Sequence, residues 1–422
     1  MSKIHFLPVK NGDSFVIECD KGDQHGLVVV DGGPTGYGRV LVAEVEETGT
    51  PDLLVLTHYD DDHIGGLKQY IEARILQGKL PAKEVWANCA GYVEVDDVST
   101  RSVIQGVKLS ELLTTLSRTG EMQWRDDVEE GIDREYPFAT IEVVSPTPEV
   151  RGMVIEKQVE EGMKKMAMTK KVELDEMMFP LEELAREPVK APNLKKSNEL
   201  ANAASIAFIL RCDGLSILML GDGYPHNVEA YLRNVKGYSE ENPLVVDYVK
   251  VAHHGSRYNT SNELLDIIRC NHFIIPTNGD VHSHPDRTAI AHILCHPGRD
   301  RNEKVHLYFN CGLDEIVKNA GAFLKDGEQE AWNFEIHEHA TELFGLTEPP
   351  KPEDPAAPVD SSEPVEPSVP ESLDSPRIAP APVSDTPAPV PDTPAPQPAR
   401  KNYWIWAAAG IVLLIVLLII LL

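Results

Sequence analysis

The sequence predicts an α/β protein with a two-layered sheet core flanked by helices, followed by a disordered proline-rich linker and a C-terminal transmembrane helix. Three observations predict this class. Short apolar runs alternate with helical patterns over residues 1–347. Of the 32 prolines, 17 lie between 348 and 399, and 403–422 is an apolar run of 20 uncharged residues. The 42% hydrophobic content of the 422 residues is enough for a large buried core.

Within 1–347, taken as one domain, strand patterns and helix patterns alternate on both sides of an insertion. We expect strands at 3–9, 15–19, 27–30, 53–56 and 141–145, with an amphipathic helix at 66–80. Residues 148–197 are dense in Lys, Glu and Met, which predicts a helical insertion. After it we expect a hairpin at 204–211 and 215–220, helices near 227–235 and 263–269, and strands at 245–252 and 273–276. This repeated rhythm favours two stacked sheets with outer helices.

Charge and cysteine content exclude some classes of protein. Asp and Glu number 67 against 39 Lys and Arg, a formal charge of -28. No broad basic face can therefore hold a phosphate backbone by charge alone. The six cysteines contain no C-x-x-C pair, which excludes a cysteine zinc ribbon and indicates a reducing compartment.

The C-terminal segments predict a tethered, single-pass membrane protein. Residues 348–402 form the linker, whose composition favours polyproline II and chain disorder. At 1.5 Å per residue, 403–422 spans about 30 Å of hydrocarbon. Arg400 and Lys401 precede this span and no basic residue follows it, so we expect the body to stay cytoplasmic. A protein partner could bind through the linker or the insertion.

The strongest site signal is Leu-Thr-His-Tyr-Asp-Asp-Asp-His-Ile-Gly-Gly at 56–66. An apolar strand ends there, and His58, Asp60, Asp62 and His63 follow within six residues. Imidazole and carboxylate groups are ligands for divalent metals, so this run predicts a metal site. A solvated charged loop is less consistent with its place at the end of a buried strand.

Two later runs also follow apolar strands. Asp222 ends one of them, and His253, His254 and Ser256 end the other. Either run alone is usual in a turn or a core. Together with the first cluster they predict side chains that converge on one centre.

These residues resemble the metallo-β-lactamase fold, and within it the hydrolase domain of the ComEC/Rec2 competence proteins. The resemblance covers about residues 3–310 and implies an αββα sandwich. Seven motifs appear in the family's order: Gly12-Asp13-Ser14, Val30-Asp31-Gly32-Gly33, the H-x-D-x-D-H run, Asn202-x-x-Ser205, Leu220-Gly221-Asp222, His253-His254-Gly255-Ser256 and Ser283-His284-Pro285.

The resemblance implies two divalent metal ions, Zn or Mn. By it, His58 and Asp60 hold the first ion, Asp62 and His63 hold the second, and Asp222 bridges them. One of His253 and His254 completes the second site, whereas Asp31 is not a ligand.

The chain also departs from the wider fold. Asp60 stands where many members have histidine, and no histidine occurs from 64 to 225. A first site poor in nitrogen favours manganese or a weakly held ion. It also argues against a lactamase and for phosphodiester chemistry.

The predicted function is a membrane-tethered phosphodiesterase or nuclease acting on nucleic acid or a nucleotide. Two ions would activate water and clamp the phosphoryl oxygens. Asp62, His254, Ser256 and His284 are the candidate catalytic side chains, although His284 could merely cap a helix. Two alternatives stay open: an esterase for small phosphoesters such as phosphocholine, and a non-catalytic metal-binding scaffold.

The remaining candidates carry weaker signals. His282 lacks a family match, and Tyr59 could line the pocket or simply pack. His292 and His296 have the spacing of a helical metal pair, but an ordinary helix face explains them better. We expect His337 and His339 to face solvent.

Overall fold

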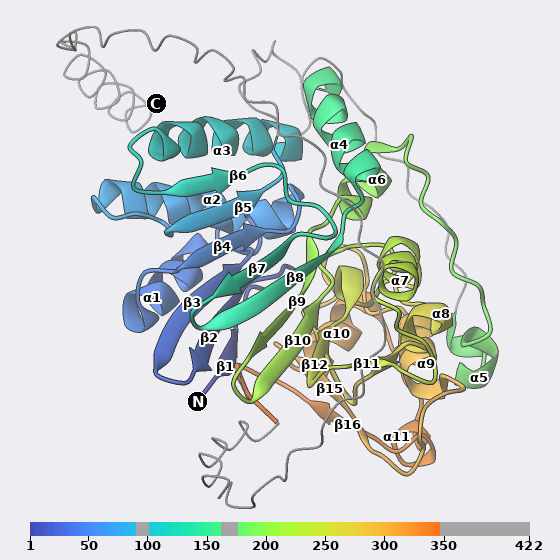
Figure 1. Ribbon diagram of the computed structural model, residues 1–422. Coiled ribbons are helices and arrows are strands. Elements are labelled where there is room, and N and C mark those ends of the chain that lie inside the picture. Colours follow the sequence, from blue (N-terminus) through green and yellow to red (C-terminus); the bar gives the residue numbers. More distant parts are fainter. Residues whose placement is uncertain (90–100, 162–175, 347–422) are drawn as a thin grey trace, which may run out of the picture. The chain divides into compact units, whose positions relative to one another are not determined.

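The computed structural model describes residues 1–89, 101–161 and 176–346. They form a four-layer αββα sandwich (Figure 1), which confirms the mixed α/β fold that the sequence predicts. The predicted linker and transmembrane span lie outside the described residues. In the part of the chain that the structure describes, no helix is long and apolar enough to cross a bilayer.

The first sheet has the strand order β17-β1-β2-β3-β4-β5-β6. β1 pairs antiparallel with β17 and with β2, and β2 pairs antiparallel with β3; from β3 to β6 the strands are parallel. Its strands are β1 (Lys3–Phe6), β2 (Phe15–Lys21), β3 (Gln24–Val30), β4 (Leu53–Leu56), β5 (Glu84–Ala87), β6 (Gln123–Arg125) and β17 (Glu342–Phe344).

The second sheet has the order β16-β15-β14-β12-β10-β9-β8-β7. It is antiparallel from β7 to β10 and parallel from β10 to β16. Its strands are β7 (Asp133–Tyr136), β8 (Ala139–Ser145), β9 (Ala207–Cys212), β10 (Leu215–Met219), β12 (Tyr248–Lys250), β14 (His272–Ile275), β15 (Val305–Phe309) and β16 (Phe334–His337); a separate pair joins β11 (Leu244–Val245) and β13 (Ile268–Arg269).

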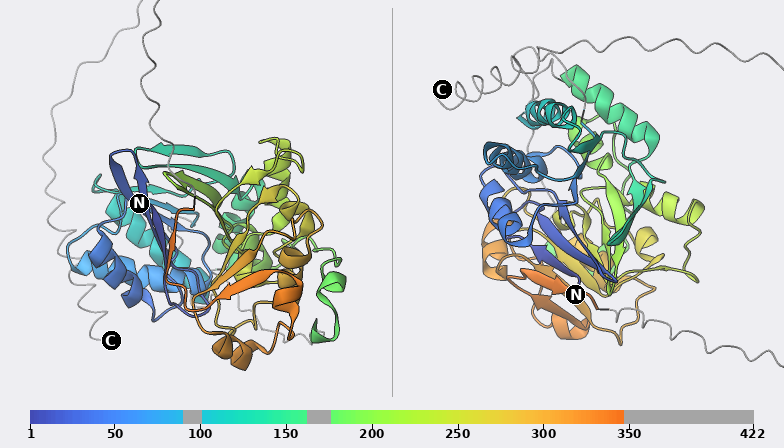
Figure 2. Two further views of the ribbon diagram at one scale, coloured as in Figure 1. Left: turned by 90° about the horizontal axis from the view of Figure 1, so that it is seen from below. Right: turned by 60° about the vertical axis from the view of Figure 1, so that its left-hand side comes forward.

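Helices cover the outer face of each sheet (Figures 1 and 2). α1 to α3 pack on the first sheet, and α5 and α7 to α10 pack on the second. The helices are α1 (Gly38–Thr48), α2 (Asp61–Leu76), α3 (Arg101–Ser117), α4 (Pro148–Glu161), α5 (Leu181–Leu184), α6 (Ser197–Ala203), α7 (Pro225–Asn234), α8 (Asn262–Leu265), α9 (Arg287–Cys295), α10 (Leu313–Ala320) and α11 (Glu328–Ala331), with short 3₁₀ turns at Glu176–Met178 and Ala252–Gly255.

Three apolar clusters hold these layers together. One lies between the sheets, and one lies between each sheet and its helices. The alternation of side chains along a strand explains this arrangement, because a strand between two layers buries both faces. β4 is therefore buried at all four positions.

The structure corrects several predicted boundaries. α2 begins at Asp61, earlier than expected, because Asp61 and Asp62 supply an acidic first turn. The strand expected at 245–252 is split, since the Asp247 carboxylate accepts hydrogen bonds from the backbone and hydroxyl of Ser216. The described part of the 148–197 insertion is less helical than expected beyond α4, because Pro180, Pro188 and Pro192 interrupt it.

Candidate metal centre

The predicted metal ligands meet where strands of the two sheets end. His58 follows β4, Asp222 follows β10, and His253 and His254 follow β12. β4 and β12 lie in the parallel parts of their sheets, and the loops after them meet, since His254 Nε2 lies 3.2 Å from the Asp62 carboxylate. Crevices at carboxyl ends are where open α/β sheets usually bind ligands.

The loop between β4 and α2 presents its carboxylates in different directions. Asp62 lies in the first turn of α2 and faces the centre, 3.2 Å from the Nε2 atom of His254. Asp61 points away, because its Oδ1 atom accepts hydrogen bonds from Thr35 and Gln105. Asp60 precedes the helix and lies 3.8 Å from the Nε2 atom of His58.

Close backbone packing fixes this turn of α2. A Cβ atom on Gly66 would lie 1.9 Å from the carbonyl oxygen of Gly32. Only glycine allows the loop after β3 to approach the helix this closely. The approach brings Asp31, at the start of that loop, against His63.

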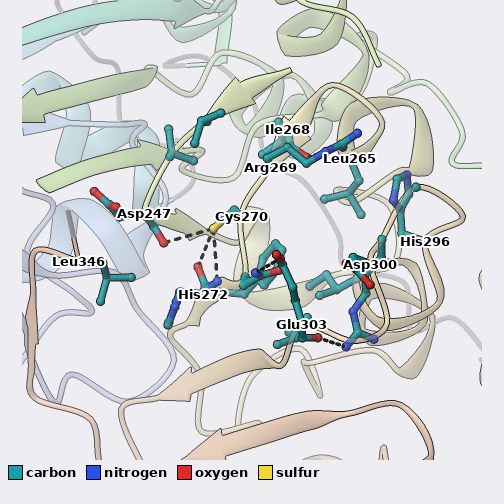
Figure 3. Close-up of a pocket in the computed structure, with 18 residues that line it drawn as sticks. Asp247, Leu265, Ile268, Arg269, Cys270, His272, His296, Asp300, Glu303 and Leu346 are labelled. Atoms are coloured by element: carbon teal, nitrogen blue, oxygen red, sulfur yellow. Dashed lines mark hydrogen bonds between the residues drawn. The ribbon is translucent and has the colours of Figure 1, made fainter. Parts of the chain in front are cut away.

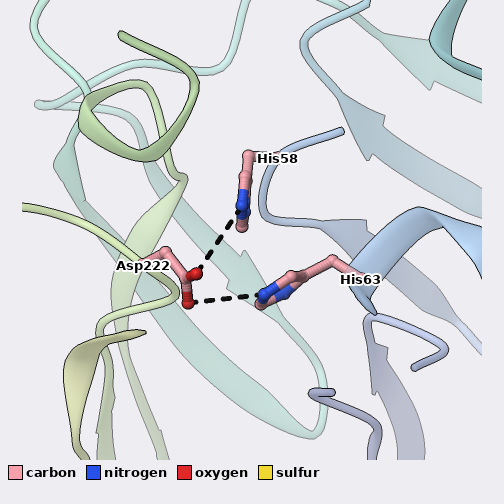
Figure 4. Close-up of side chains that lie close together, drawn as sticks. All are labelled: His58, His63 and Asp222. Carbon is pink, nitrogen blue, oxygen red and sulfur yellow. Dashed lines mark ion pairs between the residues drawn. The ribbon is translucent and has the colours of Figure 1, made fainter. Parts of the chain in front are cut away.

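Three groups of three possible ligands share His63: His58, His63 and Asp222 form one of them (Figure 4), and Asp13, Asp31 and His63 form another. The Asp222 carboxylate lies between the rings, with Oδ1 3.4 Å from His63 Nε2 and Oδ2 3.8 Å from His58 Nε2. These separations are too long for good hydrogen bonds but suit ligands around a common ion.

Asp62, His63 and His254 form the third group, with ligand atoms within 4.8 Å of one another. The two adjacent histidines after β12 have positive φ angles, 48° for His253 and 55° for His254. This backbone turns their rings to different partners. His254 faces Asp62, whereas the Nε2 atom of His253 lies 3.7 Å from Asp222 Oδ2.

The outer nitrogens of three rings are already occupied. The Nδ1 atom of His63 donates to Asp31 at 2.8 Å, and that of His254 donates to the Pro276 carbonyl at 2.8 Å. The Thr57 hydroxyl donates to Asp31, so its oxygen can accept from His58 Nδ1 at 3.2 Å. We therefore assign tautomers that leave each Nε2 lone pair free, the arrangement usual for metal-binding histidines.

The inward atoms of this cluster are buried, and none has a hydrogen-bond partner among the described residues. They are His58 Nε2, His63 Nε2, His254 Nε2, Asp222 Oδ1 and Asp13 Oδ1. Unpaired buried polar atoms each cost about 1–3 kcal/mol, so their concentration at one point needs a compensating ligand. Imidazole nitrogens and carboxylate oxygens fit divalent cations, and the residues present could hold two of them.

The electrostatic field of the cluster favours cations. Burial alone would lower the pKa of His63, but Asp222, Asp31 and Asp13 raise it well above its usual value. Burial would raise the pKa of Asp222, but the rings of His63, His253 and His254 hold it well below the usual range. The carboxylates that stabilise protonated rings would equally stabilise metal ions.

His253 differs from the other rings. Burial lowers its pKa to about 3, so its ring is neutral near pH 7. Its Nδ1 atom lies 3.3 Å from the side-chain amide of Asn202. When the amide oxygen of Asn202 accepts a hydrogen bond from His253, the amide nitrogen can donate to Asp60 Oδ2 at 3.3 Å. Asn202 can thereby position both His253 and Asp60.

Two important charges were missed by sequence reasoning. Lys250, the last residue of β12, is fully buried and in direct contact with the Asp13 carboxylate. Its Nζ atom also donates to the Gly221 carbonyl at 2.8 Å, next to Asp222. The available signals were a lysine inside an apolar strand and the Gly12-Asp13-Ser14 motif, which was matched but given no role.

A polar groove of about 500 Å³ opens beside His253. Ser256 and His284, predicted to assist catalysis, both line it, as does the weaker candidate His282. Its lining also includes Tyr224 and two exposed lysines, Lys190 and Lys196. Lys196 is paired with Glu199 at 2.6 Å, so Lys190 is the one of the two lysines that is available to an anionic substrate.

A second groove of about 440 Å³ surrounds Cys270 (Figure 3). None of the predicted site residues lines it. The Cys270 thiol lies 3.4 Å from the Asp247 carbonyl and 3.2 Å from the His272 carbonyl, and burial raises its pKa to about 12. A thiol that stays protonated is a poor nucleophile, so this groove offers no comparable chemistry.

The remaining histidine candidates and Tyr59 lie away from the metal centre or make other contacts. His292 and His296 bind different partners, Asn262 and Asp266, and do not form a metal pair. His339 is exposed as predicted, whereas His337 is only partly exposed, because its ring stacks on Tyr308 of the neighbouring strand. Tyr59 is buried in the core beneath α3 and does not line the groove.

Replacing Asp31 by asparagine should weaken metal binding by about 10–100-fold, the usual effect of losing a partner that orients a metal-binding histidine. The asparagine keeps the shape but removes the charge that holds His63 Nδ1. Metal affinity can be measured by competition with a chromogenic chelator. Asp52→Asn is a matched control, because Asp52 accepts from the Leu27 backbone but lies away from the cluster. Equal affinities in the two variants would contradict the role of Asp31.

The chain was compared with known families and structures. Residues 7–148 match the model of the metallo-beta-lactamase superfamily. No curated protein matches the chain. Among solved structures, the metallo-beta-lactamase fold protein YhfI from Bacillus subtilis shares 10% identity, with a TM-score of 0.34 over 82% of this chain and 99% of that one. A long form RNase Z from yeast shares 12% identity, with a TM-score of 0.31 over 73% of this chain and 37% of that one.

A metallo-beta-lactamase from Hirschia baltica shares 12% identity, with a TM-score of 0.21 over 49% of this chain and 58% of that one. The family match spans Asp31, His58 and the α2 turn, whereas Asp222 and His254 join them through the fold. Residues 7–148 therefore match the metallo-beta-lactamase superfamily, whose members are generally hydrolytic metalloenzymes.

Proposed function

We propose that this protein is a two-metal phosphodiesterase or nuclease that acts on nucleic acid or a nucleotide. The observation that carries the proposal is the convergence of buried, unpartnered ligand atoms from His58, His63, His254 and Asp222. When bound, two Zn or Mn ions would supply Lewis acidity and activate a water molecule.

We assign the ligands in two groups that share Asp222. His58, Asp60 and Asp222 would hold the first ion, with His253 beside it. Asp62, His63 and His254 would hold the second, which selects His254 from the two candidates that the sequence left open. The support for this choice is the 3.2 Å approach of His254 to Asp62.

The side chains around the groove suit a phosphodiester. Ser256 and His284 are placed to bind a phosphate oxygen or to donate a proton to the leaving oxygen. Lys190 would attract the anionic substrate to the rim. The oxygen-rich first site, with Asp60 in place of a histidine, is the feature that favours this chemistry over lactam hydrolysis.

Hydrolysis assays on the full-length chain test the proposal. After chelation, Zn²⁺ or Mn²⁺ should restore cleavage of a generic aryl phosphodiester. The same assay on single-stranded DNA, double-stranded DNA, RNA and cyclic nucleotides should then identify at least one of them as a substrate. Cleavage of phosphocholine esters alone would favour the small-phosphoester alternative. Absence of all turnover with two ions bound would favour the scaffold.

Replacing Asp60 by histidine should shift the metal dependence of the rate from manganese toward zinc, because a nitrogen ligand replaces an oxygen at the first ion. The measurement is the hydrolysis rate of the chelated enzyme titrated with each metal. Asp61→Asn is the matched control, since the Asp61 carboxylate points away toward Thr35 and Gln105. An unchanged metal profile in Asp60→His would remove Asp60 from the ligand set.

The membrane anchor at 403–422, the cytoplasmic position of the body and a protein partner for the linker or insertion belong to the same proposal. They rest on the sequence, because 347–422 and 162–175 lie outside the described residues. Accessibility labelling of the body in intact and permeabilised cells tests the orientation.

A further inference from the structure

A separate group of possible metal ligands, away from the candidate metal centre, lies on the parallel edge of the second sheet. His306 is on β15, and Glu335 and His337 are on β16. Their ligand atoms all lie within 4.8 Å of one another. None of the three lines the groove beside the metal centre.

The strand geometry explains this convergence. In the parallel register, His306 is directly opposite Glu335, and Tyr308 is opposite His337. Residues two apart on a strand share a face, so Glu335 and His337 point to the same side as His306. A carboxylate and two imidazoles thus form a triangle across two hydrogen-bonded strands.

Stacked rings hold the two imidazoles in place. The rings of His272 and His306 are parallel within 4°, with centroids 4.6 Å apart. On the other side, the His337 ring stacks on Tyr308 at 4.5 Å. Restricted rings lose little conformational entropy when they bind a ligand.

The spacing of the nitrogens suits a small cation. His306 Nδ1 and His337 Nε2 are 2.9 Å apart and form a hydrogen bond between the two rings, which a bound cation would replace. Tetrahedral zinc, with Zn–N bonds of about 2.0–2.1 Å, separates two ligand nitrogens by about 3.3 Å. The rings would need to part by only a few tenths of an ångström.

We propose that His306, Glu335 and His337 form a peripheral site for a divalent transition metal such as zinc, separate from the dinuclear centre. Three protein ligands leave a fourth position for water or a further ligand. The His₂Glu set is nitrogen-rich, so it favours zinc over magnesium or calcium.

Lys304 is the main opposing charge. Its Nζ atom lies 3.2 Å from the Glu335 carboxylate, and both side chains are about half exposed. An exposed ion pair contributes only about 0–1 kcal/mol, so metal binding can displace it. The ion pair should nevertheless reduce the affinity of the site for zinc. Removing Lys304 should therefore raise zinc affinity, whereas removing a ligand should lower it.

The test is zinc titration of the chelated full-length chain by equilibrium dialysis, with bound metal measured by elemental analysis. His306→Gln and Glu335→Gln should each lose about one zinc per chain at a concentration that saturates the unaltered protein. Lys304→Gln should keep that zinc and bind it severalfold more tightly, because it frees Glu335 without removing a ligand.

His25→Gln is the matched control. His25 is also a strand histidine beside a carboxylate, 2.8 Å from Asp20, but has no second histidine next to it. It should leave the zinc content unchanged. Equal zinc content in His306→Gln, Glu335→Gln and the His25→Gln control would overturn the proposal. Weaker zinc binding by Lys304→Gln would also overturn it, because that variant keeps all three ligands.

Discussion

Asp222→Asn should lower phosphodiester hydrolysis by at least about a hundredfold and reduce bound metal toward one ion per chain. The Asp222 carboxylate lies between the rings of His58 and His63, with one oxygen toward each (Figure 4). Asparagine keeps the side-chain shape but removes the negative charge that two neighbouring cations would share. Steady-state rates and elemental analysis of the purified protein measure the two effects.

A second aspartate provides the control for this experiment. Asp280 is exposed, and its described hydrogen bond is a backbone contact to Asn278, so Asp280→Asn should leave rate and metal content near normal. If Asp222→Asn kept two ions and a near-normal rate, the dinuclear assignment would be wrong. The remaining histidines and aspartates would then form a single-metal or structural site.

Much of the metal centre was predictable because its ligands follow strand ends. A run of apolar residues that stops at His58 or Asp222 indicates where a buried strand leaves the sheet, and carboxyl ends gather at one edge. The four-residue strand before His58 was predicted with its observed boundaries. Position along a strand was therefore enough to bring these side chains together.

Choosing between His253 and His254 required the three-dimensional structure. In a regular strand, adjacent side chains point to opposite faces, but both residues here have positive φ angles. Left-handed backbone at two consecutive non-glycine residues is uncommon, and no turn residue in the sequence signals it. The direction of each ring therefore depends on contacts made after the sheets assemble.

The convergence of the histidines of β15 and β16 is another feature that was not predicted from the sequence. Strands at 305–309 and 334–337 were not predicted, although both runs alternate apolar and polar residues. Parallel pairing joins segments that are far apart in the chain, and its register depends on packing. His337 was expected in solvent because it lies near the end of the body, but its ring stacks on Tyr308.

Lys250 is the buried charge with the largest expected effect on stability. It is fully buried beneath the metal centre, in contact with the Asp13 carboxylate and hydrogen-bonded to Gly221. Breaking a buried ion pair by removing one partner usually costs about 3–5 kcal/mol, because the remaining charge has no partner. An exposed ion pair seldom contributes more than about 1 kcal/mol.

Lys250→Met should therefore reduce the free energy of unfolding of the chelated protein by about 3–5 kcal/mol. Denaturant titration followed by tryptophan fluorescence measures this change. Lys83→Met is the matched control, because Lys83 pairs with Asp52 at 2.6 Å but is 70% exposed, and its loss should cost less than about 1 kcal/mol. Adding Asp13→Asn to Lys250→Met should restore part of the loss, since it removes the unpaired charge. If Lys250→Met were no more destabilising than Lys83→Met, the contact with Asp13 would not be a stabilising ion pair.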